Sequence, residues 1–89
     1  MTLNVPACFQ YEAAYIGFPL NKPGGDNKYE EIKTALDCQK LCLGKTGCKW
    51  FNLDDNGCWL KTGKGRREDQ PGGVTGPKSC SASEEEGMN

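Results

Sequence analysis

Six cysteines within 89 residues, in a chain that contains no histidine, constrain this protein more than any other feature of its sequence. The cysteines are Cys8, Cys38, Cys42, Cys48, Cys58 and Cys80. An even number of cysteines in so short a chain predicts a disulfide framework, which forms in an oxidising compartment outside the cytoplasm. Counting alone leaves about fifteen pairings of the six open.

The missing histidine removes the commonest general base, the usual partner of a cysteine nucleophile and the commonest metal ligand. The remaining residues supply no serine triad and no nucleotide-binding glycine motif. We therefore expect a binding module rather than an enzyme, with no catalytic residue and no cofactor.

The length allows a single small domain, which commonly needs covalent cross-links because it buries little apolar surface. We place the folded domain at residues 6–81 and expect residues 82–89 to be an acidic flexible linker or tail. No apolar run is long enough for membrane insertion. The residues after Met1 lack the features of a secretory signal, which we interpret as a module belonging to a longer secreted protein.

The net charge of −1 gives no reason to expect a nucleic acid partner. Its distribution is uneven, however, because residues 40–67 hold seven basic and two acidic side chains. The candidate contacts to a sulfated glycan or an acidic protein are Lys61, Lys64, Arg66 and Arg67. The competing interpretation is a solvated basic loop. Tyr29, beside the loop 22–28, is a further candidate for ligand binding.

A helix is predicted to begin at about Tyr29 or Thr34 and to end at Leu43. Thr34 is a favourable N-cap residue, and Asp37 follows it three positions later. Gly44 is predicted to end the helix in the left-handed conformation.

Within this helix Cys38 and Cys42 share one face, so both sulfur atoms are expected to point toward the core. A hairpin is expected beneath them. Its strands are predicted at 48–53 and 58–61, and the sequence Asp-Asp-Asn-Gly at 54–57 is a strong turn signal.

The rest of the chain is less regular. The mixture of aromatic and β-branched residues from Phe9 to Gly17 predicts a first strand. Glycine, proline and asparagine at 21–27 predict a loop. The glycine-rich segment from Thr62 to Ser79 is expected to be mobile, with a short final strand at 74–78.

Metal binding is the main alternative to disulfides, because four thiolates can hold zinc. Only Cys38 and Cys42 have the close spacing of a zinc-binding pair, and no second pair accompanies them, so the spacing favours disulfides. Asp54 and Asp55 lack the longer series of oxygen ligands that calcium needs and are better explained by the hairpin turn. We expect no metal site.

Three aromatic residues, Trp50, Phe51 and Trp59, have the ring surfaces that stack on sugars. Because they alternate with cysteines on predicted strands, a position in the core is the favoured interpretation.

The order and spacing of several short motifs together resemble the PAN/apple module, and the match spans nearly the whole domain. The motifs are Cys8-Phe9, Asp37-Cys38-Gln39-Lys40-Leu41-Cys42, Gly47-Cys48-Lys49-Trp50-Phe51, Gly57-Cys58-Trp59-Leu60-Lys61 and Val74-Thr75-Gly76-Pro77-Lys78-Ser79-Cys80.

The resemblance implies an α+β fold, a small disulfide-rich domain with one helix packed across an antiparallel sheet of about five strands, as in the amino-terminal domain of hepatocyte growth factor. It also implies which cysteines pair. The implied pairs are Cys38 with Cys58, Cys42 with Cys48, and Cys8 with Cys80.

The resemblance further implies an extracellular module that binds proteins or carbohydrates in cell adhesion. The sequence is similar to one repeat of the multi-apple microneme adhesins of coccidian (Eimeria-type) parasites, which are secreted from the microneme. The expected partners are a host-cell surface protein or glycan and the neighbouring apple modules.

A small disulfide-rich protease inhibitor or toxin-like secreted effector is the alternative function. It needs an exposed, bridged loop, and the glycine-rich segment at 62–79 does not favour one.

Overall fold

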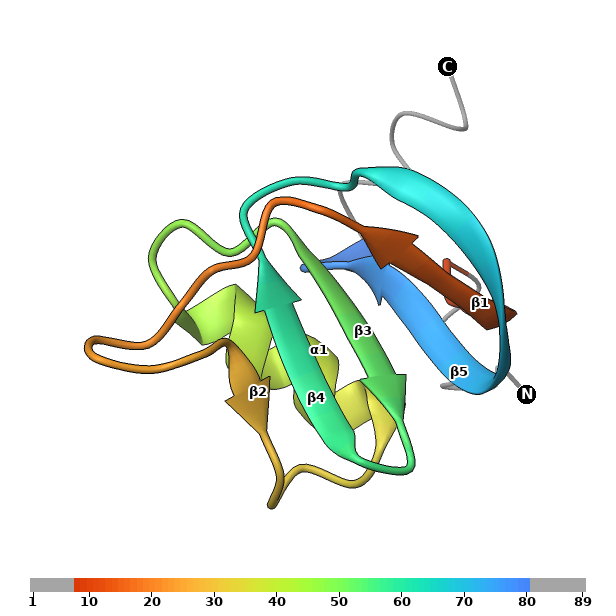
Figure 1. Cartoon of the computed structure of the whole chain (residues 1–89), viewed down its shortest axis with the longest axis horizontal. Helices are drawn as coiled ribbons and strands as arrows, with labels where there is room; N and C mark the ends of the chain where they lie inside the picture. The colour runs from red at the N-terminus through yellow and green to blue at the C-terminus, as the bar shows by residue number, and fades with distance from the viewer. Residues whose placement is uncertain (1–7, 81–89) are drawn as a thin grey trace, which may run out of the picture.

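The structure, a computed structural model, describes residues 8–80. Within these residues, one helix and five strands follow one another (Figure 1). They are β1 (Gln10–Ile16), β2 (Lys28–Tyr29), α1 (Ala35–Gly44), β3 (Trp50–Asp54), β4 (Gly57–Lys61) and β5 (Arg66–Pro77). The strands form one antiparallel sheet in the order β1-β5-β3-β4-β2. In Figure 1, α1 lies behind β3 and β4. The predicted α+β architecture is therefore confirmed.

The start of α1 is set by Thr34, as the capping pattern predicts. The Oγ1 atom of Thr34 accepts a hydrogen bond from the backbone N of Asp37 at 3.1 Å, which satisfies one of the free donors of the first turn. The alternative start at Tyr29 is wrong, because this residue belongs to β2 and pairs with Cys58 of β4.

The end of α1 differs from the prediction. Gly44 is the last helical residue but does not have a positive φ. The chain instead leaves the helix in an extended conformation at Lys45, whose backbone N donates to Cys42 O at 3.1 Å. The left-handed residue is Gly47, with φ of 90°. This later reversal brings Cys48 back to its disulfide partner, Cys42.

Two disulfides anchor α1 to the sheet. Cys38 is bonded to Cys58 of β4, and Cys42 is bonded to Cys48 just before β3. A third disulfide, Cys8–Cys80, joins the two ends of the domain with a Cα–Cα distance of 5.5 Å. These are the pairs that the family resemblance implies.

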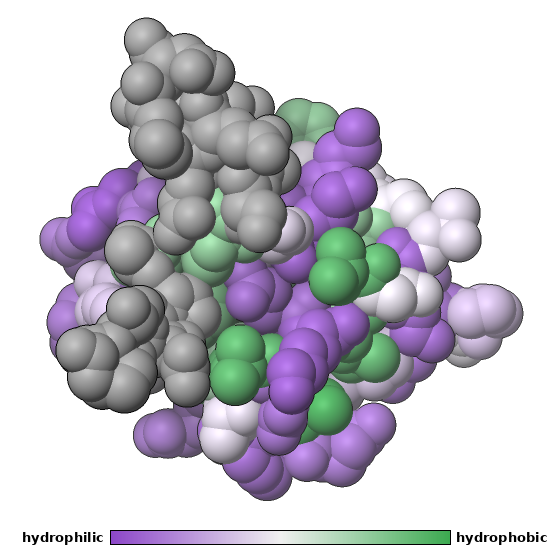
Figure 2. Space-filling model, turned by 180° about the vertical axis from the view of Figure 1, so that it is seen from behind, coloured by the Kyte–Doolittle hydropathy of each residue, from purple (hydrophilic) through white to green (hydrophobic). Residues whose placement is uncertain are grey.

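Apart from its cysteines, the helix contributes mainly the partly buried Ala35 and Leu41 to the core. Only Cys38, Gln39 and Cys42 are buried on it, whereas Leu36 and Leu43 are 43% and 60% exposed. Seen from the side opposite to Figure 1, the surface has separate apolar side chains among hydrophilic ones (Figure 2). On its buried side α1 is attached to the core by the disulfides of Cys38 and Cys42, with Ala35 and Leu41 packed beside them.

The core lies between α1 and the sheet. Phe51 and Leu53 of β3 and Leu60 of β4 pack there against the sulfur atoms of the two helix disulfides. Phe9 packs on Phe51 edge to face, with 5.3 Å between ring centroids. Because side chains alternate along a strand, Asn52 and its neighbours on β3 point to the opposite face of the sheet.

The expected mobile segment at 62–79 is wrong for most of its length, because residues 66–77 form β5. The first part of β5 pairs with Ala13–Ile16 of β1, and the last part pairs with β3. Between these parts the strand bends, with φ of 79° at Gly72, whose backbone N donates to Glu12 Oε1 at 3.2 Å. The sequence pattern predicts only the end of this strand, at 74–78, because residues 66–69 are all charged.

Side-chain hydrogen bonds fix β1 and β5 over β3. Asn52 accepts a hydrogen bond from Tyr15 N at 3.1 Å and donates one to Tyr15 O at 2.7 Å, as a backbone partner in a sheet would. The buried Thr75 hydroxyl accepts from Trp50 Nε1 at 2.6 Å and lies 2.7 Å from two acceptors, Phe51 O and Asn52 Oδ1. The hydroxyl thus connects β5 to three consecutive residues of β3.

We predict that Thr75→Val lowers the free energy of unfolding by about 1–3 kcal/mol, because valine has the same shape but leaves Trp50 Nε1 without its acceptor. Urea unfolding of the oxidised protein measures the change. Thr46→Val, at an exposed position, is the matched control and should unfold at the wild-type urea concentration. Equal midpoints for Thr75→Val and wild type would contradict this role of the hydroxyl.

Candidate functional site

Lys61, the first basic residue proposed to bind a ligand, is only 3% exposed. Its Nζ atom donates a hydrogen bond to Gly17 O, in the segment that follows β1. Burial lowers the pKa of Lys61 below its ordinary value, because the charged ammonium loses water. In the structure this side chain supports the turn after β1.

The other basic candidates lie elsewhere. Lys64 Nζ is 5.0 Å from the ring centroids of both Tyr15 and Trp50, where a cation interacts favourably with the ring faces. Arg66 pairs with Glu68 at 2.5 Å, and Arg67 pairs with Asp69 at 3.1 Å. The start of β5 therefore carries equal numbers of positive and negative charges.

Tyr29 is far from Arg66 and Arg67 in the sheet order, because β2 and the β1–β5 pair are at opposite edges, whereas Lys61 is on β4, next to β2. Lys22 Nζ lies 4.4 Å from the Tyr29 ring centroid, and Lys45 Nζ lies 5.9 Å from it. The structure thus does not gather the five candidate residues into one site, and ligand binding by any of them stays a prediction.

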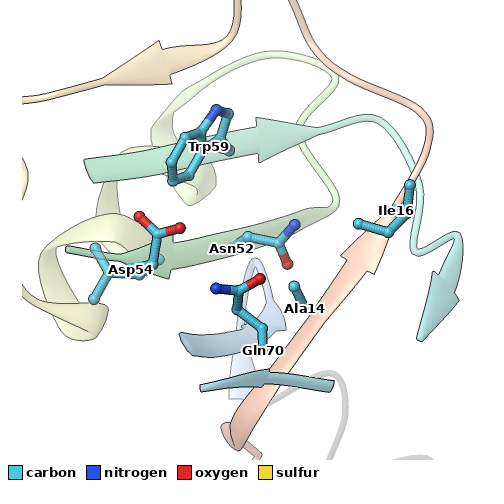
Figure 3. Close-up of a pocket in the computed structure, with 7 residues that line it drawn as sticks. Ala14, Ile16, Asn52, Asp54, Trp59 and Gln70 are labelled. Carbon is cyan, nitrogen blue, oxygen red and sulfur yellow. The ribbon is translucent and has the colours of Figure 1, made fainter. Parts of the chain in front are cut away.

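A pocket of about 220 Å³ opens on the sheet between strands that are far apart in sequence (Figure 3). Its lining residues are Ala14, Ile16, Asn52, Leu53, Asp54, Trp59 and Gln70. Asn52 and Trp59 are directly paired across β3 and β4, so their side chains share the face that points away from α1.

Three of these side chains offer contacts to a ligand, and Figure 3 shows them bordering the same hollow from β3, β4 and β5. Trp59 is half-buried and presents its indole ring. Asp54 is half-buried, and its Oδ1 accepts a hydrogen bond from Asn56 N at 2.7 Å in the hairpin turn. Among residues 8–80 no ion pair involves the Asp54 carboxylate, and no hydrogen bond within the domain involves the side-chain amide of the half-buried Gln70.

The position of Gln70 depends on Gly73, two residues after the proline in the bend of β5. A Cβ atom at Gly73 would lie 2.8 Å from Gln70 Cγ and 2.9 Å from Ala13 O. Glycine is therefore required where the strand turns back on itself and places the Gln70 side chain beside β1.

The sequence predicts this pocket only in part. Trp59, for which the sequence favours the core over sugar stacking, is half-buried and lines the pocket. Phe51, by contrast, is fully buried in the core, as favoured. Asp54 does form the hairpin turn that was expected of it, in addition to lining the pocket. Nothing in the sequence singled out Gln70, because its place depends on the register of β5.

The pocket combines an aromatic surface with a carboxylate and an amide, groups that bind by stacking and hydrogen bonding. No group of three or more histidine, cysteine or acidic side chains that could hold a metal ion occurs among residues 8–80. In the same part of the chain, no helix is long and apolar enough to cross a membrane.

Comparison with known proteins gives one clear match. The model of the PAN domain family matches residues 8–85, a range that contains all six cysteines. A search of curated proteins found no match.

The buried ammonium of Lys61 leads to a prediction about pH. Because its pKa is lower in the folded than in the unfolded protein, the unfolded state binds more protons as the pH approaches the ordinary lysine pKa of about 10.4. The free energy of unfolding of wild type should therefore rise relative to that of Lys61→Met as the pH increases through the folded-state pKa.

Urea unfolding of both proteins from neutral to alkaline pH measures this difference. Lys40→Met, at an exposed helix position, controls for replacing a lysine by methionine. A difference between wild type and Lys61→Met that stays constant or falls with pH would contradict the assignment.

Proposed function

The chain belongs to the PAN domain family, and we propose that it is an extracellular adhesion module that binds a protein or a carbohydrate through the pocket between β1, β3, β4 and β5. Domains of this family are generally non-catalytic binding modules. The observation that carries the proposal is the convergence of Trp59, Asp54 and Gln70, from three strands, on one pocket.

The division of the sheet into two faces supports the use of this pocket. One face is occupied by α1 and its disulfides, which form the core. The other face exposes polar and aromatic side chains from several strands, a rigid support of the kind on which binding sites are commonly built. The pocket therefore lies where ligand binding does not compete with core packing.

The disulfides support the proposed extracellular location. All six cysteines are bonded in the structure, and such frameworks persist in oxidising compartments. We propose that the protein is secreted.

We further propose that the domain is one repeat of a multi-apple microneme adhesin of the coccidian type, which attaches to a protein or glycan on the host-cell surface. The resemblance of the motifs supports this origin. The Cys8–Cys80 disulfide supports a repeat, because it brings the two ends of the domain together and leaves the rest of its surface accessible. Weak sites on neighbouring modules would then combine into strong attachment.

We predict that the oxidised domain binds cultured host cells weakly as a monomer and about a hundredfold more strongly when four copies are linked on streptavidin, because linked sites gain avidity. Flow cytometry with the labelled protein measures binding. Ala14→Arg, which places a large side chain in the pocket, should abolish most of it. Gln70→Arg places a large side chain in the pocket from the β5 side and serves as a second variant.

Thr46→Arg introduces the same charge at an exposed position outside the pocket and should bind as wild type does. Circular dichroism and a fully oxidised mass establish that each variant is folded. Wild-type binding by both pocket variants would place the binding face elsewhere. Stoichiometric inhibition of a secreted protease by the monomer would support the alternative function as an inhibitor.

A further inference from the structure

We infer that the pocket binds a single neutral sugar ring, which stacks on Trp59 and is held through its hydroxyl groups by Asp54 and Gln70. This inference rests on the proposed function and narrows its ligand from proteins and carbohydrates in general to uncharged carbohydrate.

The size of the pocket suits one sugar ring. Its volume of about 220 Å³ lies below the range of roughly 300–1,000 Å³ typical of sites for drug-sized molecules. A longer glycan would therefore place one residue in the pocket and extend its remaining residues over the surface.

The aromatic and apolar walls suit the face of a sugar ring. The face of an indole is electron-rich, and the C–H groups on one side of a hexose carry a slight positive charge, so the two surfaces attract when stacked. Trp59 supplies the indole, and Ala14 and Ile16 of β1 supply apolar contacts across the hollow. Ile16 is 44% exposed, so part of this wall is open to a ligand.

The polar groups suit hydroxyls, each of which both donates and accepts hydrogen bonds. The Asp54 carboxylate accepts several hydrogen bonds, of which the described residues supply one, from Asn56 N. A ligand hydroxyl that donates to it forms a charge-assisted bond. The amide of the half-buried Gln70, which forms no hydrogen bond with residues 8–80, both donates and accepts.

The charges around the pocket favour a neutral ligand over a charged one. A sulfate or carboxylate group would be repelled by Asp54, which no ion pair neutralises in the described part of the chain. A lysine or arginine side chain from a protein partner would meet the ammonium of Lys28, 5.8 Å from the Trp59 ring centroid. A cation would also leave the N–H donors of Gln70 without an acceptor.

The test is a titration of the ¹⁵N-labelled 89-residue protein, followed by the backbone and side-chain N–H signals in NMR. The neutral probes are galactose, glucose, mannose and N-acetylglucosamine at millimolar concentrations. The charged probes are sialic acid, heparin, N-acetyl-lysinamide and N-acetyl-argininamide. We expect a neutral sugar to shift the indole N–H of Trp59, the side-chain amide of Gln70 and the backbone of Asp54.

Three variants and one control sharpen the result. Trp59→Ala should weaken sugar binding roughly tenfold, since an aromatic contact contributes about that much. Gln70→Ala, which removes only a half-buried polar group, should weaken it without affecting the fold. Asp54→Asn keeps an acceptor for the hairpin turn and should weaken a neutral sugar only moderately. Tyr11→Ala removes an aromatic ring that is 56% exposed outside the pocket and should bind as wild type does.

Several results would overturn the inference. These are tighter binding of heparin or sialic acid than of every neutral sugar, binding of a cationic amide that Asp54→Asn abolishes, or no pocket shifts with any neutral sugar. If cells still bind the tetramer through the pocket while neutral sugars neither shift the signals nor compete, the proposed adhesion function stands and the sugar inference fails.

Discussion

The two disulfides between α1 and the β3–β4 hairpin are the constraint on which the rest of the structure depends. The helix buries Cys38, Cys42 and Gln39, and it turns Leu36 and Leu43 toward solvent, so packing of apolar side chains alone would hold it weakly. Each native disulfide contributes about 2–4 kcal/mol, a large part of the stability of a small domain. Under the helix these sulfur atoms pack with Phe51, Leu53 and Leu60 in a small core.

The core uses only the face of the sheet that lies against α1, so the other face is open to binding. There β1 and the bent strand β5 cross β3, held by the hydrogen bonds of Asn52 to Tyr15 and of Thr75 to β3. The crossing places Gln70 across the hollow from Trp59 and Asp54. The core and the candidate site thus share the same strands but use alternate residues along them, as the pleat of a sheet dictates.

The parts of the fold with local signals were predictable from sequence. The Thr34 helix cap and the Asp-Asp-Asn-Gly turn depend on neighbouring residues, and both predictions are confirmed. The prediction of a left-handed Gly44 is wrong, because the chain reverses later, at Gly47, on its way to Cys48. The disulfide pairing followed from the family resemblance, not from spacing. The pocket could not be predicted from the sequence, because Ala14 and Gln70 come together only through the pairing of β1 with β5. The charged start of β5 has no strand-like alternation that would indicate this pairing.

The anchoring of α1 by disulfides is best tested by proteolysis and mass spectrometry of the untreated protein under non-reducing conditions. We expect Cys38 to be linked to Cys58, Cys42 to Cys48 and Cys8 to Cys80, with no free thiol. Free thiols at Cys38 or Cys42, or a link from either to a different cysteine, would contradict the anchoring of the helix. They would also contradict the proposal that the face of the sheet opposite to the helix binds the ligand.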